Sequence, residues 1–361
     1  MSDKNLKYAK ASLKNELKAV DLFCGAGGLT HGLEKSGIKV ELGIDIDPAC
    51  EYPYSANNDA RFLLKSVDEV KASELLEIYD GAELKLLAGC APCQTFSTYN
   101  QKADSSDERW WLLLQFSRLI RETSPELVTM ENVPGLAEQD IFHRFVQDLE
   151  DLRYFIDYRV VNCADYGLPQ HRNRLVLLAS KLGTIKLLEP KDLKWRRMKV
   201  EDAIGKMPPI KAGCIDDKDA LHQSACLSDM NYERILASKP GGTWRDWPKE
   251  LRADCHKRKS GKTYPSVYGR MRWDEPAPTI TTQFYGFGNG RFGHPEQDRA
   301  ISLREGAILQ SFPKKYKFIA PGKPIKKKVV GRLIGNAVPV KLGKVIGVSI
   351  LKHLEQYEAA I

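Results

Sequence analysis

The sequence predicts an α/β protein with a doubly wound, mainly parallel sheet and a second, smaller and loop-rich domain. Three observations support this. From residue 17 to about residue 180, short apolar runs alternate with longer amphipathic ones, the pattern of βαβ units with parallel strands. After Pro190 the apolar periodicity weakens, while Pro, Gly, Lys and Asp increase. An apolar-periodic helix then runs to about Leu354.

The elements follow in order after a polar, Lys-rich lead-in at residues 1–16. We expect strands at Lys18–Phe23, Lys39–Ile46, Glu83–Ala88, Leu127–Met130 and Arg174–Ala179. We expect helices at Gly28–Ser36, from about Trp110 to Glu122, and at Ile141–Leu152. The last helix needs an apolar core that the polar middle segment cannot supply. The predicted sheet domain is therefore residues 17–188, completed by 331–361, and the second domain is residues 189–330.

Composition and charge limit the classes of function. With 361 residues the chain is long enough for two domains. Between Lys191 and Lys262, 17 Lys and Arg face 11 Asp and Glu, which fits a polyanionic partner or simply a solvated basic surface. The eight cysteines are scattered, and we find no secretory signal and no apolar stretch that would cross a bilayer. We expect a cytoplasmic, nucleoid-associated protein with reduced thiols and no membrane partner.

A glycine turn follows the first predicted strand. Asp21-Leu22-Phe23-Cys24-Gly25-Ala26-Gly27-Gly28 runs from that strand to a helix N-terminus, where a ligand approaches the backbone closely. Thr30 replaces the third glycine of a dinucleotide-binding motif, and either Asp45 or Asp47 follows at the end of the next strand. A carboxylate there suits two ribose hydroxyls. The pattern favours an adenosine-containing ligand, S-adenosylmethionine rather than NAD.

Cys93 lies in Gly89-Cys90-Ala91-Pro92-Cys93-Gln94-Thr95-Phe96-Ser97, just after an apolar run. A thiol in such a loop is a candidate nucleophile. Cys90-x-x-Cys93 also fits half a zinc site or a redox dithiol, but no second Cys/His pair stands at ligand spacing, and we expect no metal. A buried, inert thiol is the remaining alternative.

Two further segments place charges at strand ends. Glu131 ends an apolar strand, where a carboxylate is costly without a partner. In Gln170-His171-Arg172-Asn173-Arg174, the two arginines point to the same side if the segment is extended. They then suit a carbonyl oxygen or a phosphate, or are surface charges.

Together with Gly335-Asn336-Ala337-Val338-Pro339, these segments resemble, in order, the motifs of the C5-cytosine-specific DNA methyltransferase family of the bacterial restriction–modification type. The resemblance runs from residue 17 to about residue 345 and implies catalysis and cofactor binding in the sheet domain and target recognition in the second. The implied catalytic residues are Cys93, Glu131, Arg172 and Arg174. The implied cofactor-binding residues are Phe23, Gly25, Gly27, Asp45, Val67, Pro92, Leu112 and Asn336. Where the family commonly has an acid near the adenine, this chain has Ser66, with Asp68 as a substitute.

The family further implies the reaction and the partners. Cys93 adds to C6 of a flipped-out cytosine, Glu131 assists at N3, and S-adenosylmethionine methylates C5 to leave S-adenosylhomocysteine. We expect a monomer that acts on double-stranded DNA, with a cognate restriction endonuclease encoded nearby as a further partner. Arg245, Arg258 and Lys259 are candidate DNA contacts. Two rivals are an RNA cytosine methyltransferase of the same architecture and a silent nucleic-acid-binding paralogue, whose mark would be the loss of Cys93, Glu131 or Arg174.

Overall fold

The computed structural model describes residues 17–92, 111–258 and 260–360. The chain divides into two compact units, described here separately. The sheet unit comprises residues 1–162, 173–195 and 338–361, and the loop unit comprises residues 163–172 and 196–337. The unit boundaries thus differ from those expected, since residues 163–172 and 331–337 belong to the loop unit. The functions expected of the two domains stay predictions.

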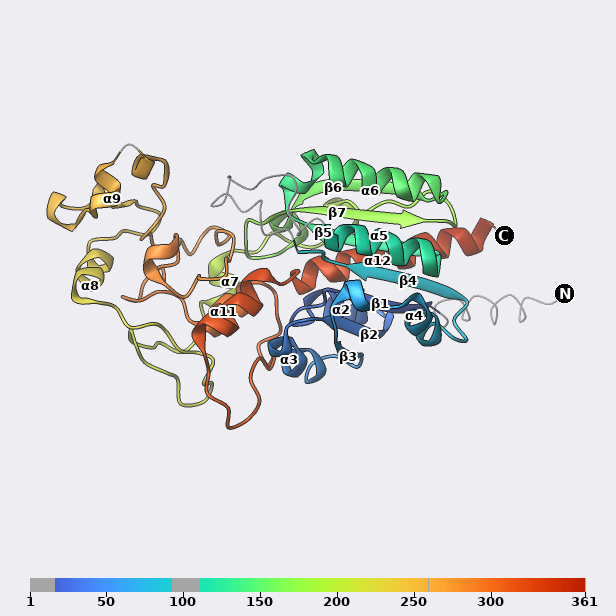
Figure 1. The fold of residues 1–361 in the computed structure, drawn as a ribbon. Helices are drawn as coiled ribbons and strands as arrows, with labels where there is room; N and C mark the ends of the chain where they lie inside the picture. Colours follow the sequence, from blue (N-terminus) through green and yellow to red (C-terminus); the bar gives the residue numbers. More distant parts are fainter. Residues whose placement is uncertain (1–16, 93–110, 259, 361) are drawn as a thin grey trace. The chain divides into compact units, whose positions relative to one another are not determined.

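A seven-stranded sheet in the order β3-β2-β1-β4-β5-β7-β6 forms the centre of the sheet unit (Figure 1). Strands β1 to β5 pair in parallel, whereas β7 pairs antiparallel with both β5 and β6. The predicted α/β class with a mainly parallel sheet is confirmed. The strands are β1 (Leu17–Leu22), β2 (Lys39–Asp45), β3 (Arg61–Leu64), β4 (Leu84–Gly89), β5 (Leu127–Asn132), β6 (Phe155–Asn162) and β7 (Asn173–Ser180).

The helices of the sheet unit are α2 (Gly28–Ser36), α3 (Glu51–Ser55), α4 (Ala72–Ile78), α5 (Trp111–Thr123), α6 (Asp140–Asp151) and α12 (Val340–Ala360). One core joins α4, α5 and α6 to the face of the sheet that carries Val20 and Leu22. Side chains alternate along a strand, so Asp21, which accepts a hydrogen bond from Thr30 of α2, points to the opposite face. Helices therefore cover both faces, as the doubly wound pattern predicts.

Helix α12 packs directly on α2. An added Cβ on Gly347 would lie 2.1 Å from Ser36 Oγ, and one on Gly32 would lie 2.4 Å from the Val340 carbonyl. Within Lys327–Ala360 one 18-residue window is apolar enough to span a membrane, but 78% of it is buried inside the protein. That burial is the pattern of a core helix, and it explains the apolar periodicity near the end of the chain.

The loop unit contains short helices joined by long connections. They are α7 (Val200–Ile204), α8 (Asp229–Leu236), α9 (Asp254–Lys257), α10 (Leu303–Leu309) and α11 (Lys327–Asn336). Its core includes a fully buried ion pair in which two guanidinium nitrogens of Arg299 each lie 2.7 Å from a carboxylate oxygen of Glu305. Ser302 and Glu305 form a capping box at the start of α10. Polar networks of this kind order a segment that has little apolar periodicity.

Candidate active site

The glycine turn between β1 and α2 lies beside Asp45 at the end of β2. One oxygen of Asp45 accepts the backbone N–H of Gly25 at 2.8 Å and the other accepts that of Asp47 at 2.9 Å. Gly25 and Gly27 have φ of 54° and 85°, and Phe23 also has a positive φ of 58°. A Cβ added to Gly25 would meet no atom within 4 Å, so the turn presents bare backbone to open space. Asp45 thereby fixes a turn to which a ligand has close access.

Beneath this turn, Asp21 is almost fully buried. Its Oδ2 accepts a hydrogen bond of 2.7 Å from Thr30, whose hydroxyl also lies 3.0 Å from the Tyr54 hydroxyl. Burial raises the pKa of Asp21 from 3.8 to about 7, and the hydrogen bond from Thr30 acts in the opposite direction. Thr30, which breaks the dinucleotide spacing in the sequence, therefore serves to hold the end of β1.

The carboxyl ends of β1, β4 and β5 are joined by hydrogen bonds at one edge of the sheet. The backbone N–H of Cys90 donates to the Leu22 carbonyl at 3.2 Å. Asn132 donates through its side-chain amide to the Ala91 carbonyl at 3.0 Å. The segment that enters Pro92 and Cys93 is thus held between the ends of both neighbouring strands. Cys93 itself lies outside the described residues, and Pro92 is exposed.

Glu131 is the centre of the charged cluster at this edge, and its side chain is only 3% exposed. The Cys90 thiol donates to Oε2 at 3.1 Å. Arg174 Nε lies 2.9 Å from Oε1 as an ion pair, but its N–H is not aimed along a hydrogen bond. Among the described residues, Oε1 has no hydrogen-bond partner. A buried carboxylate oxygen in that state can exchange a hydrogen bond with a ligand.

Register explains why Arg174 reaches Glu131. Because β7 runs antiparallel to β5, Glu131 pairs with Val176, and Arg174 lies just beyond the paired ends of these strands. Desolvation of the Cys90 thiol, followed by the negative charge of Glu131, raises the pKa of Cys90 well above its ordinary value. Cys90 therefore stays a thiol and acts as a hydrogen-bond donor. The sheet edge combines a buried carboxylate, a cation and a neutral thiol.

Gln170 and Arg172 belong to the loop unit and connect its segments. Arg172 donates to the carbonyls of Ile280 at 3.0 Å and Gly335 at 2.9 Å. Gln170, fully buried, accepts the Ile280 N–H at 2.7 Å and donates to the Gln310 side chain at 2.7 Å. Through these contacts Arg172 connects separate segments of the loop unit. In the same unit, Asn336 is exposed at the end of α11.

Comparison with known proteins identifies the family. Residues 17–352 match the family model described as C-5 cytosine-specific DNA methylase. The chain belongs to the C-5 cytosine-specific DNA methylase family. It is 53% identical over 339 residues to the type II methylase M.HgiDII of Herpetosiphon aurantiacus, with coverage of 93% of this chain and 95% of the relative. It is 31% identical to the type II methyltransferase M1.HphI of Haemophilus parahaemolyticus, covering 93% and 87%.

Solved structures agree on the fold. A prophage-encoded protein from E. coli superposes with a TM-score of 0.72 at 22% identity, covering 94% of this chain and 99% of that one. The Dnmt2 methyltransferase of S. pombe gives a TM-score of 0.60 at 18% identity, again with 94% and 99% covered. These structures show the fold alone, an α/β fold. The family match and the type II relatives identify the protein as a DNA (cytosine-5-)-methyltransferase.

The other sequence-predicted residues of this methylase are spread over both units. In the sheet unit, Phe23 and Leu112 are half-buried and Val67 is 2% exposed within the core. In the loop unit, Arg245 and Arg258 are exposed, and Lys259 lies outside the described residues. Two cavities of about 440 Å³ each are lined by residues other than those of the glycine turn. The site is defined instead by hydrogen bonds at the sheet edge.

Several residues of the site were missed from the sequence. In the sequence Cys90 was considered only as part of half a zinc site or a redox dithiol, yet its thiol contacts Glu131. Ile46, between the two acids Asp45 and Asp47, keeps 69% of its side chain exposed, a large apolar surface beside the glycine turn. The sequence does contain an indication of this surface, because Ile46 is an apolar residue at a strand end. Only the acids on either side of it were considered as site residues.

We predict that Asp45→Ala weakens S-adenosylmethionine binding much more than Asp47→Ala. Asp45 holds both Gly25 and Asp47 in the turn, and a carboxylate oxygen can accept more than one hydrogen bond, whereas Asp47 accepts the N–H of Ala49. A hydrogen bond to a carboxylate contributes about 1.5–3 kcal/mol, so the Kd of the Asp45 variant should rise at least about tenfold. Calorimetry of both variants checks this prediction. Equal losses of cofactor affinity in the two variants would mean that Asp45 was the wrong acid to choose.

We also predict that Cys90→Ala slows methyl transfer about tenfold, because a buried oxygen of Glu131 then loses its donor. Cys90→Ser keeps a donor and should recover most of the rate. Cys50→Ala, at a buried thiol of the same unit, is the matched control. The measurement is kcat at saturating cofactor and DNA. A serine variant as slow as the alanine variant would exclude the hydrogen bond as the cause.

Proposed function

We propose that this enzyme transfers a methyl group from S-adenosylmethionine to C5 of a cytosine flipped out of a specific duplex DNA sequence. Reaction at a stacked base requires extrusion from the duplex, at a cost of about a few kcal/mol. The supporting observation is the arrangement of Glu131, buried between Cys90 and Arg174 with one oxygen that accepts no hydrogen bond from the described residues. Cys93 follows the strand end next to it.

The chemistry assigned to the chain's own residues is nucleophilic addition with acid assistance. The Cys93 thiolate forms a bond to C6 while Glu131, in its protonated form, gives a hydrogen bond or its proton to N3, and the electron pair of the C5–C6 double bond moves to C5. Arg174 balances the charge of Glu131 and offers its outer nitrogens to the base. After methyl transfer, loss of the C5 proton and departure of Cys93 restore the aromatic ring.

The glycine turn fits the adenosine end of the cofactor. Gly25 exposes its backbone to open space, the carboxylate of Asp45 lies at this turn and suits ribose hydroxyls, and Ile46 and Phe23 offer apolar surface for the adenine. The side chains of Val67 and Leu112, with Pro92 and Asn336, are the remaining proposed contacts. S-adenosylmethionine, when bound, supplies the electrophilic methyl group, and S-adenosylhomocysteine remains. We propose no role for a metal.

The partners follow from this function. Double-stranded DNA is the proposed substrate, and the type II relatives favour a cognate restriction endonuclease as the functional counterpart. We propose that the enzyme acts as a monomer in the cytoplasm, at the nucleoid. Residues 189–330, with 17 cations against 11 acids between Lys191 and Lys262, are the proposed reading domain.

Sequencing of methylated cytosines tests the proposal directly. The chain is expressed in cells whose DNA has no C5-methylcytosine, and both genomic DNA and total RNA are sequenced after bisulfite treatment. We expect methylation at one short DNA sequence throughout the genome. Methylcytosine confined to RNA, or none in either nucleic acid, would overturn the proposal.

A further inference from the structure

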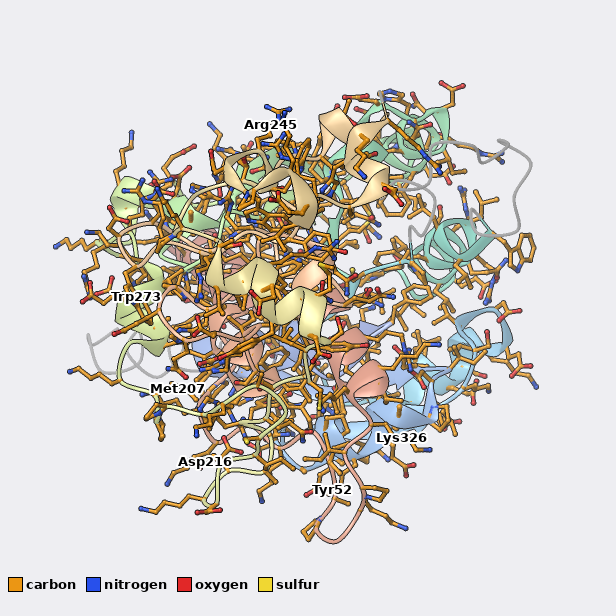
Figure 2. All side chains as sticks on the ribbon, turned by 90° about the vertical axis from the view of Figure 1, so that its left-hand side faces the viewer. Tyr52, Met207, Asp216, Arg245, Trp273 and Lys326 are labelled. Atoms are coloured by element: carbon orange, nitrogen blue, oxygen red, sulfur yellow. The ribbon has the colours of Figure 1, made fainter. Side chains whose placement is uncertain are left out.

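A cavity of about 440 Å³ lies in the loop unit, within its most basic segment. Its lining residues are Trp244, Arg245, Arg252, His256 and Lys257. This volume is within the range of small-ligand pockets, about 300–1,000 Å³, and exceeds what a water molecule needs. Figure 2 shows Arg245 at one end of the loop unit and Asp216 toward the other.

The wall of the cavity is a fixed aromatic stack. The ring of His256 lies 4.3 Å from the indole of Trp244 at an interplanar angle of 14°, and the ring of Tyr268 meets it edge-on at 5.8 Å. Trp244 is held in turn by a hydrogen bond of 3.0 Å from its indole nitrogen to the Tyr264 carbonyl. The imidazole is 4% exposed and is therefore held in one place by its neighbours.

Three buried nitrogens at this cavity have no hydrogen-bond partner among the described residues. They are Nδ1 and Nε2 of His256 and Nε of Arg252. The rest of the Arg252 guanidinium is anchored, because a terminal nitrogen donates to the carbonyls of Arg245 at 2.6 Å and Trp247 at 3.1 Å. Buried polar atoms in proteins almost always have partners, and each one left without a partner costs about 1–3 kcal/mol. Burial lowers the pKa of His256, so its ring is neutral and has one donor and one acceptor nitrogen. The cluster therefore offers two donors, the ring N–H of His256 and the Nε–H of Arg252, to a ligand with acceptor atoms.

The charges around the cavity select an anion. Three of the lining side chains are cationic, and no acid is among the described residues that line it. Of the nearby carboxylates, Asp254 pairs with Lys257 at 2.7 Å and Asp246 accepts the N–H of Thr243 at 2.7 Å. Arg245 lies over the Trp244 ring at 5.5 Å and is exposed. The cavity thus combines excess positive charge with an apolar ring surface.

We propose that this cavity binds one backbone phosphate of duplex DNA, with the sugar of the same nucleotide against the Trp244–His256 stack. The proposal rests on the proposed function and adds Arg252, His256 and Lys257 to the expected contact Arg245. A phosphodiester supplies both the charge and the acceptor oxygens that the unpartnered nitrogens need. The contact positions the duplex and carries no base sequence by itself.

The test measures binding of a short, fluorescent duplex of random sequence by the full-length protein, from about 50 to about 200 mM salt. Arg245→Gln and Lys257→Gln should each lower the slope of log K against log salt, by at most about 0.9 in total because a single phosphate is contacted. His256→Phe keeps the stack but removes both ring nitrogens, and should weaken binding about tenfold. Lys218→Gln, an exposed cation of the loop unit that does not line the cavity, is the control and should change neither quantity.

Duplexes with a single uncharged methylphosphonate identify the phosphate. At one backbone position the methylphosphonate should weaken wild-type binding more than it weakens binding by Arg245→Gln, because part of the same contact is already lost in the variant. The proposal is overturned if the salt slopes of the cavity variants equal that of Lys218→Gln. It is also overturned if the variants lose affinity only for the sequence that the enzyme methylates, which would indicate a base contact. DNA binding and methyl transfer are measured separately. A negative result in the binding experiment therefore leaves the proposed reaction intact, and a protein that transfers no methyl group can still be tested for the salt dependence of DNA binding.

Discussion

Cys93→Ala is expected to abolish methyl transfer while leaving S-adenosylmethionine binding nearly unchanged. Without the thiol, no bond forms at C6, and C5 never becomes nucleophilic enough to take the methyl group. Duplex DNA with 5-fluorocytosine at the target should trap the wild type covalently, because no C5 proton can leave. The measurements are transfer of a radiolabelled methyl group, calorimetry with the cofactor, and a denaturing gel for the trapped complex.

Cys90→Ala is the informative companion to that variant. Cys90 lies three residues away and contacts Glu131, but its raised pKa keeps it a thiol. The Cys90→Ala variant should therefore retain measurable methyl transfer and still form the trapped complex with 5-fluorocytosine DNA. If Cys93→Ala turned over near the wild-type rate while Cys90→Ala did not, the nucleophile would have been assigned to the wrong cysteine.

Glu131→Gln is expected to lower the single-turnover rate by about 10²–10⁴, the usual contribution of general acid–base catalysis. Glutamine has nearly the same shape and can still accept from Cys90 and face Arg174, but its amide cannot supply a proton to N3. Cofactor affinity should stay within about threefold, because the loss occurs only as charge develops on the base.

Glu126→Gln is the matched control, at the other end of the same strand. Glu126 accepts the backbone N–H of Lys85 at 2.8 Å, a contact that glutamine preserves. The Glu126→Gln variant should therefore leave the rate of methyl transfer unchanged. Equal rates for Glu131→Gln and the wild type would remove the acid from the mechanism. Equal losses for the two variants would show a general effect on β5 instead of a proton transfer.

The sequence predicted the central strands and helices well, because each is an apolar run or a clear amphipathic period. It missed β3, β6, α3 and α4, and the two strands were missed for a physical reason. Strands β3 and β6 lie at the two edges of the sheet, and β6, with the sequence FIDYRVVN, is mostly half-buried or exposed. Such a strand needs polar residues on one side and so lacks the apolar run by which the other strands were found.

Individual site residues could be proposed from the sequence only where a strand end carries an unusual side chain, as at Asp45 and Glu131, and their roles stay predictions. The partners of those side chains depend on tertiary register. Arg174 meets Glu131 because β7 is antiparallel to β5, and no local pattern encodes that pairing. The cavity beside His256 was likewise invisible, since the stack joins residues of separate turns that have no periodicity.

The close fit of α12 on α2 has a consequence for synthesis on the ribosome. Helix α2 follows the glycine turn and is among the first elements translated, whereas the glycines that allow its partner to approach, Gly343 and Gly347, are among the last. Domains usually fold as units while the nascent chain grows. Here the sheet unit is complete only when residues 338–361 have left the exit tunnel, after the whole loop unit has emerged. A nascent chain therefore carries the glycine turn well before α12 can pack on the helix that follows that turn.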